Sequence, residues 1–373
     1  MFGKIFRGIA RLIRFIRSAF VNGIFLLVIV LIVASLNQLQ PDTVPENAVL
    51  WLEPSGSIVE QYSFNDPLVK LLNPDQLAQE TSLTDIVQAI ELAAADDRIK
   101  LVVITPDKIT HIGHSAINSI HRALDKVKAA GKPVLARSRG MEQHQYLLTA
   151  KADEIIIHPM AHVAISGYGA YRDYMKSALD KLSIDVHVFR VGDFKSALEP
   201  FMRNSMSDEA KRANQQLLGG LWRHYVDSVA AYRELAPVDI NAYANDYAAL
   251  LQAHNGSTAE LALAQGLVDS LATDEEFWTT LEQMFPSLKT DENPAVGLQA
   301  YLASNTSLKA PVITPSVAVV TVEGAIIDGE APPGTAAGDS VAKLLWDAKN
   351  RDDIKSVVLR VNSGVGSAVA SEI

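Results

Sequence analysis

The sequence contains no cysteine among its 373 residues. This absence excludes disulfide bridges, thiolate catalysis and zinc sites built on cysteine. Basic residues are also in the minority, with 33 Lys and Arg against 43 Asp and Glu and a formal net charge of -10. No basic stripe follows residue 20, so we expect no nucleic-acid binding, which depends on clustered Lys and Arg.

Phosphate-binding motifs are missing as well. The chain has no G-x-x-x-x-G-K-[ST] loop and no G-x-G-x-x-G turn. His111 and His114 lie three positions apart, but the sequence offers no obvious third ligand beside them. We therefore interpret the two histidines as a loop pair and predict neither a cofactor nor a metal.

The N-terminus carries the longest apolar run. Residues 19–36 are apolar except for Asn22, Gly23 and Ser35. This run is about the minimum length for a bilayer-spanning helix, and the basic residues before it should keep the N-terminus cytoplasmic. We predict a basic amphipathic segment and transmembrane anchor over residues 1–36, with the bulk of the protein outside. A cleaved signal peptide is the alternative, because residues 33–35 loosely match a cleavage site. The basic residues are Lys4, Arg7, Arg11, Arg14 and Arg17.

The rest of the chain alternates apolar strands with amphipathic helices. Residues 37–47 are polar and read as a linker, and the first domain is predicted over residues 48–284. Alternating strands and helices indicate an α/β fold with parallel pairing and right-handed crossovers. The expected strands are 48–52, 58–59, 101–104, 134–136, 154–157, 187–190 and 267–269, and the expected helices are 83–95, 115–130, 143–150, 170–182, 207–233 and 259–264.

A lone lysine stands out at the end of the expected strand 187–190. Lys195 has Phe194, Ala197, Leu198 and Phe201 as near neighbours in the sequence. Apolar neighbours remove water from an amine and disfavour its charged form, and a neutral lysine can act as a base. The alternative is a lysine that reaches into solvent from an ordinary amphipathic turn.

The beginning of the chain recurs near its end. Residues 316–327 echo residues 48–59, and residues 347–359 echo residues 92–104. A tandem duplication explains these echoes better than chance similarity between unrelated strand and helix units. We expect a linker over residues 285–315 and an incomplete second domain over 316–373. Six identities at one offset support the second echo: Ala93 and Ala348, Asp97 and Asp352, Ile99 and Ile354, Lys100 and Lys355, Val102 and Val357, and Val103 and Val358.

The lysine segment HVFRVGDFKSALEPF (187–201) resembles that of the signal peptide peptidase family, in its long, tandem-domain protease IV type. ADEIIIHP (152–159), GLVDSLA (266–272) and VVLRVNS (357–363) extend the resemblance. It implies a ClpP/crotonase-like fold in tandem, a single-pass anchor in the inner membrane and a periplasmic bulk. It also implies a homo-oligomer, a tetramer, that cuts signal peptides or other hydrophobic peptides with a serine-lysine dyad, in which Lys195 is the general base.

The resemblance places the nucleophile outside this sequence. The family's serine lies in the second domain beyond the point that matches Ile373, and the first copy has SRGMEQHQYLL (138–148) in the corresponding place. The family's N-S-P-G-G-S pattern, which forms the oxyanion hole, is replaced by a variant with Gly364, Val365 and Gly366. We therefore expect this chain alone to be inactive and Lys195 to be more hydrated than in a complete enzyme.

Two other functions stay open at this point. The altered loop at 363–367 favours a non-catalytic membrane scaffold or binding protein derived from the peptidase. Acyl-CoA chemistry on the related crotonase fold is a further alternative, which rests on fold analogy alone.

Overall fold

The computed structural model describes residue 17, residues 22–27, residue 29 and residues 44–63, 79–286, 294–305 and 316–373. Most of the predicted anchor and most of the predicted linker 37–47 lie outside these residues, so both stay predictions. Residues 22–27 are helical. Within the described part of the chain, no helix is long and apolar enough to cross a membrane.

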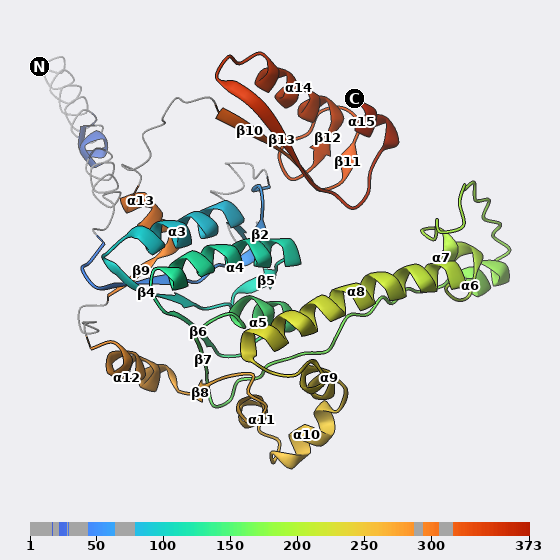
Figure 1. Cartoon of the computed structure of the whole chain (residues 1–373). Coiled ribbons are helices and arrows are strands. Elements are labelled where there is room, and N and C mark those ends of the chain that lie inside the picture. Colours follow the sequence, from blue (N-terminus) through green and yellow to red (C-terminus); the bar gives the residue numbers. More distant parts are fainter. Residues whose placement is uncertain are drawn as a thin grey trace, which may run out of the picture.

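A six-stranded parallel sheet forms the centre of the first unit (Figure 1). Its apolar strands are buried on both faces, as expected for a parallel sheet. A smaller parallel sheet of β2 (Gly56–Val59), β3 (Glu80–Ser82) and β5 (Ile109–His111) lies beside it. The central strands, in their order across the sheet, are β8 (Ser270–Leu271), β7 (Glu154–Ile157), β6 (Val134–Ser138), β4 (Ile99–Ile104), β1 (Ala48–Leu52) and β9 (Ala295–Gly297).

Helices cover the two faces of this sheet. On one face α3 (Leu83–Ala95), α4 (His114–Ala129) and α5 (Gln143–Thr149) bury their apolar sides in the larger core. On the other face α12 (Asp274–Met284) packs Phe277 and Leu281 against the strands. The helices predicted at 83–95, 115–130 and 143–150 are confirmed to within one residue at each end. α3 and α4 carry apolar stripes, whereas α5 is buried continuously from Gln145 to Thr149.

A long helix, α8 (Asp208–Arg233), runs from the core into solvent (Figure 1). Ser207 caps its start by accepting a hydrogen bond from the Ala210 N–H, and two acidic residues occupy its first turn. Its C-terminal half is buried through Tyr225 and Val229, whereas its N-terminal half projects beside α6 (Lys176–Lys181) and α7 (Glu199–Met202). After α8 the chain forms α9 (Pro237–Asn245), α10 (Tyr247–Ala253) and α11 (Thr258–Ala264).

Four sequence-based expectations differ from the structure. The strand expected at 267–269 lies farther along the chain, as β8 (Ser270–Leu271). The strand expected at 187–190 is irregular, because none of the described strands pairs with it. The helix expected over 170–182 is reduced to α6. Part of the expected linker 285–315 is ordered: β9 pairs with the outer edge of β1, and α13 (Leu298–Ser304) follows it.

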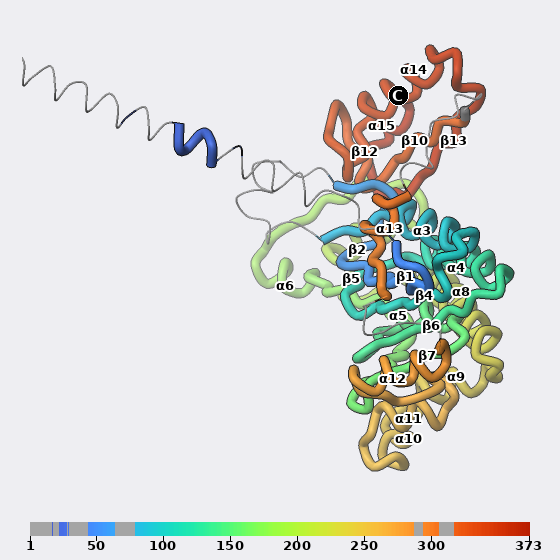
Figure 2. The backbone as a smooth tube through the Cα atoms, turned by 90° about the vertical axis from the view of Figure 1, so that its left-hand side faces the viewer, coloured from blue at the N-terminus to red at the C-terminus, as the bar shows by residue number. Residues whose placement is uncertain are grey.

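The second unit contains β10 (Ser316–Glu323) and β13 (Ile354–Asn362), which pair in parallel, with α14 (Gly338–Lys349) between them. Two short strands, β11 (Ile326–Ile327) and β12 (Ala336–Ala337), and the final helix α15 (Ala368–Glu372) complete it. Figure 2 shows this unit on the α3 side of the first unit. An ion pair between Arg360 and Glu60 and a hydrogen bond from the Gln61 N–H to Glu323 (2.9 Å) join the two units.

Candidate functional site

Lys195 lies in an irregular segment between α6 and α7, at the outer end of α8 (Figure 1). The residue is exposed, in line with the expected hydration. Phe194 is 61% exposed and Phe201 is 38% exposed, so these rings do not enclose the lysine. The apolar shelter suggested by the local sequence is therefore absent in the described chain, and the amine is presented outward.

The backbone around Lys195 is nevertheless well defined. Arg190 donates a hydrogen bond from Nη1 to the Lys195 carbonyl (2.8 Å), and the Lys195 N–H points to the Gly192 carbonyl (3.4 Å). Gly192 has φ +101°, a conformation that favours glycine. The Arg212 guanidinium of α8 lies 5.9 Å from the centre of the Phe194 ring. These contacts fix the lysine loop to the outer end of α8.

Glu199 has a structural role that sequence reasoning missed. Its side chain is 2% exposed, and Oε2 accepts a hydrogen bond from the N–H of Ser207 (3.1 Å), the residue that caps α8. Burial disfavours its charged form, but the hydrogen bond from Ser207 and the charges of Arg203 and Arg190 outweigh this effect and hold its pKa below the usual value. Glu199 thus ties the segment that follows Lys195 to the start of α8. Nothing in the local sequence around Glu199 indicated that this side chain would be buried.

The segment 138–148, which the resemblance predicts to match the family's serine segment, fills structural roles in the first unit. Gln143 accepts hydrogen bonds at Oε1 from the N–H groups of Ser166 (3.0 Å) and Gly167 (2.7 Å). Met141 is fully buried, and the Ser138 hydroxyl donates to the Gly140 carbonyl (2.8 Å). The segment therefore presents no serine hydroxyl to solvent.

The loop with the three oxyanion-hole candidates forms a turn from β13 into α15. The Ile326 N–H donates to the Val365 carbonyl (3.0 Å), and the Ser367 N–H donates to the Ile326 carbonyl (2.9 Å). A Cβ on Gly366 would lie 2.3 Å from the Ile326 Cβ, so only glycine fits there. Val365 is 74% exposed and is not among the residues with positive φ, so its replacement of glycine causes no backbone strain.

The structure does not bring the lysine and this loop together. Lys195 lies beyond the outer end of α8, whereas residues 363–367 lie beside α15 in the second unit (Figures 1 and 2). Of the two histidines, His114 contacts a tyrosine of the first unit: its Nε2 lies 2.7 Å from the Tyr168 hydroxyl. In the described residues, no three His, Asp or Glu side chains form a group that could hold a metal.

A helix-covered parallel sheet with a projecting arm defines an α/β protein. Comparison with known proteins finds similarity to one family of peptidases. The model of peptidase family S49 matches residues 126–285. "Protease 4" of Salmonella typhi is 36% identical over 97% of this chain, and "Protease 4" of Haemophilus influenzae is 35% identical over 96%. These matches support a member of the signal peptide peptidase A and protease IV family, within peptidase family S49.

The matches cover only part of each relative. The chain spans 60% of the length of both Protease 4 relatives. "Serine protease SPPA, chloroplastic" of Arabidopsis thaliana is 22% identical over 78% of this chain and 42% of that protein. Among solved structures, an enoyl-CoA hydratase from Mycobacterium avium subsp. paratuberculosis covers 62% of this chain, and the match covers 75% of the hydratase, with 16% identity and a TM-score of 0.29.

Proposed function

We propose that this chain is the lysine-bearing part of a membrane-anchored serine endopeptidase that degrades cleaved signal peptides and similar hydrophobic peptides. Lys195 is the general base that takes a proton from a serine hydroxyl. The observation that carries this proposal is the outward presentation of Lys195 on a fixed loop, in a chain of peptidase family S49.

The surroundings of the Lys195 amine support its role as the base for a serine that lies outside the first unit. Among the described residues, the Lys195 amine has no hydrogen bond or ion pair. A serine-lysine dyad needs the two groups within hydrogen-bond reach, about 2.6–3.2 Å. The serine therefore comes from a complete second unit, of the kind that the longer relatives have room for.

The arrangement around the site follows from the same proposal. The second unit is the start of a second ClpP/crotonase-like domain in tandem with the first. Residues 1–36 anchor the protein in the inner membrane, with the N-terminus cytoplasmic and the bulk periplasmic. The apolar side chains of the arm, such as Phe189 (94% exposed) and Val191 (91% exposed), support assembly into a homo-oligomer, a tetramer, around the site.

The experiment measures hydrolysis of a fluorogenic hydrophobic peptide. The 373-residue chain alone should be inactive, and a protein that joins it to the serine-bearing part should be active. Lys195→Ala in that joined protein should lower kcat by at least about a thousandfold, because the serine then has no base. Lys181→Ala, which removes an exposed lysine of α6 on the same arm, is the matched control. Lys195-dependent hydrolysis by the chain alone would contradict the proposed division of the site.

A non-catalytic membrane scaffold is the second candidate. The loop 363–367 favours it, because Val365 stands where the family pattern has glycine. In this case the joined protein would bind hydrophobic peptides and fail to cut them. Activity would then require the family pattern to be restored by Gly364→Pro and Val365→Gly. Peptide hydrolysis by the joined protein, measured with and without these two substitutions, separates the two candidates.

A further inference from the structure

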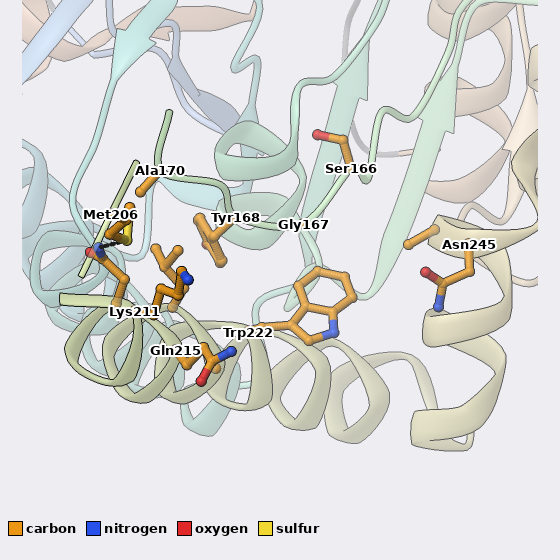
Figure 3. Close-up of a pocket in the computed structure, with 13 residues that line it drawn as sticks. Ser166, Gly167, Tyr168, Ala170, Met206, Lys211, Gln215, Trp222 and Asn245 are labelled. Atoms are coloured by element: carbon orange, nitrogen blue, oxygen red, sulfur yellow. Dashed lines mark hydrogen bonds between the residues drawn. The ribbon is translucent and has the colours of Figure 1, made fainter. Parts of the chain in front are cut away.

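A cavity of about 520 Å³ lies between α8 and the connection 166–170 (Figure 3). Tyr168 and Trp222 form its aromatic sides, Met206 and Leu218 add apolar surface, and the lining also includes the amides of Asn214, Gln215 and Asn245. Its lining contains one charged side chain, Lys211, which also pairs with Asp208 at 3.4 Å. A cavity of this size and mixed lining suits a neutral ligand with an apolar group and several amide groups.

The aromatic sides are held in place without a ligand. Trp222 donates from Nε1 to Asn241 Oδ1 (2.9 Å) and stacks on the buried Tyr225 ring, with 5.4 Å between ring centres and 8° between planes. The Tyr168 hydroxyl contacts His114 Nε2 at 2.7 Å. Because these rings are already fixed, binding would cost little ordering of side chains.

The backbone beside the cavity has free hydrogen-bonding groups. Gln143 accepts from the N–H groups of Ser166 and Gly167, but the next three residues lack such a cap. In the part of the chain that the structure describes, the N–H groups of Tyr168, Gly169 and Ala170 make no hydrogen bond. An extended peptide can pair with such free backbone groups while its side chains enter a neighbouring pocket.

We propose that this cavity in the first unit binds an extended peptide and places one large apolar side chain against the Tyr168 and Trp222 rings, which meet edge to face with 6.4 Å between ring centres. The site holds the peptide, and cleavage belongs to the proposed Lys195 centre. The choice of peptide as ligand rests on the proposed function. Lys195 is not among the residues that line the site.

Two adjacent glycines of α8 offer a matched test. A Cβ on Gly219 or Gly220 would meet no atom within 4 Å, but only Gly219 lines the cavity. Gly219→Leu should occupy part of the cavity beside Trp222 without disturbing the fold, and Gly220→Leu should leave the cavity unchanged. Both changes favour the helix.

The probe is a fluorescein-labelled peptide of about eight Leu, Ala and Phe residues flanked by lysines, and binding to the full chain is measured by fluorescence anisotropy. Gly219→Leu should weaken binding at least about tenfold, and Gly220→Leu should change it less than about twofold. The peptide should also slow hydrogen exchange at Tyr168, Gly169 and Ala170. Equal binding by the two variants would overturn the proposal.

A second outcome would also overturn it. Protection of residues 168–170 that grows with protein concentration in the absence of peptide would assign the cavity to a second copy of the chain. The measurement needs no hydrolysis, so its result stands apart from the Lys195 experiment. Loss of cleavage in Lys195→Ala with equal peptide binding by the Gly219 and Gly220 variants would support the proposed function and reject this site.

Discussion

The strands of the two units pair in the same pattern, but other elements cover them to different extents. β1 pairs with β4 and β10 pairs with β13 in matching register, and both pairs shift register after their first residue. Val103 in the first unit is fully buried, whereas the identical Val358 in the second is 50% exposed. Burial is therefore decided by the helices that cover a strand and not by the strand's own residues.

The apolar space beside the strands differs in the same way. In the first unit Ile109, Ile120 and Leu148 close it to about 10 Å³. In the second unit the corresponding space beside Val341 and Leu359 measures about 270 Å³. A few covering side chains from later elements thus convert an open apolar groove into a core.

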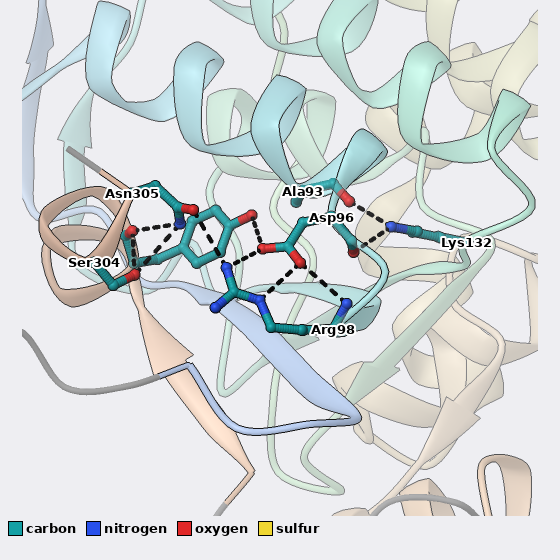
Figure 4. Close-up of polar contacts among 7 residues, drawn as sticks. Ala93, Asp96, Arg98, Lys132, Ser304 and Asn305 are labelled. Carbon is teal, nitrogen blue, oxygen red and sulfur yellow. Dashed lines mark hydrogen bonds and ion pairs between the residues drawn. The ribbon is translucent and has the colours of Figure 1, made fainter. Parts of the chain in front are cut away.

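The turns that lead into the two strands show a reversed ion pair. Arg98 pairs with Asp96 (2.8 Å) in the first unit, and at the matching positions Arg351 pairs with Asp353 (2.7 Å) in the second. The first pair is also bound by α13, because the Tyr301 hydroxyl donates to Asp96 (3.0 Å) (Figure 4). Hydrogen bonds from Arg98 and Tyr301 hold the pKa of Asp96 below its usual value. In the second unit Arg351 stands at the position of Asp96, and an arginine cannot accept the hydrogen bond that Tyr301 of α13 donates. This helix therefore fits the first unit.

The largest expected effect compares two identical residues. Val103→Ala should lower the free energy of unfolding by about 2.5 kcal/mol, because it removes buried methyl groups and leaves a cavity. Val358→Ala, half exposed, should lower it by less than about 1 kcal/mol. Denaturant unfolding of the chain measures both values. Equal losses would show that the second unit is covered in solution.

Acid should destabilise the first unit selectively. His121 is 3% exposed, its Nε2 lies 3.0 Å from the Leu148 carbonyl, and burial lowers its pKa to about 4. Lys151 and Asp125 face it with opposite charges and partly cancel. Because the unfolded chain binds the proton near pH 6.5 and the folded chain only near pH 4, stability falls as pH drops between these values.

The expected loss between pH 7 and pH 5 is about 2 kcal/mol from this group. Thermal unfolding at the two pH values measures it, and His121→Gln is the control that should lose much less. Residues 316–373 contain no histidine, so hydrogen exchange in β10 and β13 should change little over the same range. A uniform change in both units would contradict this assignment.

The smallest expected effect concerns the reversed pairs. Asp96→Ala should cost about 1–2 kcal/mol, because it leaves the buried Tyr301 hydroxyl without its acceptor. Arg351→Ala at the matching exposed position should cost less than about 0.5 kcal/mol. Proteolysis at residues 298–304 should accelerate only in the Asp96 variant. If proteolysis at residues 298–304 is equally slow in both variants, the Arg98–Asp96 pair does not hold α13 in place.

Much of the fold could be predicted from the sequence because local patterns specify it. The helices at 83–95 and 115–130 carry apolar stripes, and the long helix begins at a Ser207 cap followed by acids. The register of the repeat follows the six identities between residues 93–103 and 348–358. The candidate lysine was also visible in the sequence, through the resemblance of the segment 187–201. Its catalytic role and the oxyanion role of residues 364–366 stay predictions.

Only the tertiary structure decided what surrounds these elements. The apolar residues near Lys195 suggested shelter, but the segment projects with α8 beyond the core and stays exposed. Residues 187–190 have a strand-like pattern and lack a partner strand, whereas residues 295–297 find one in β1. Pairing and burial depend on elements that are distant in the chain, and a local sequence pattern carries no information about their position.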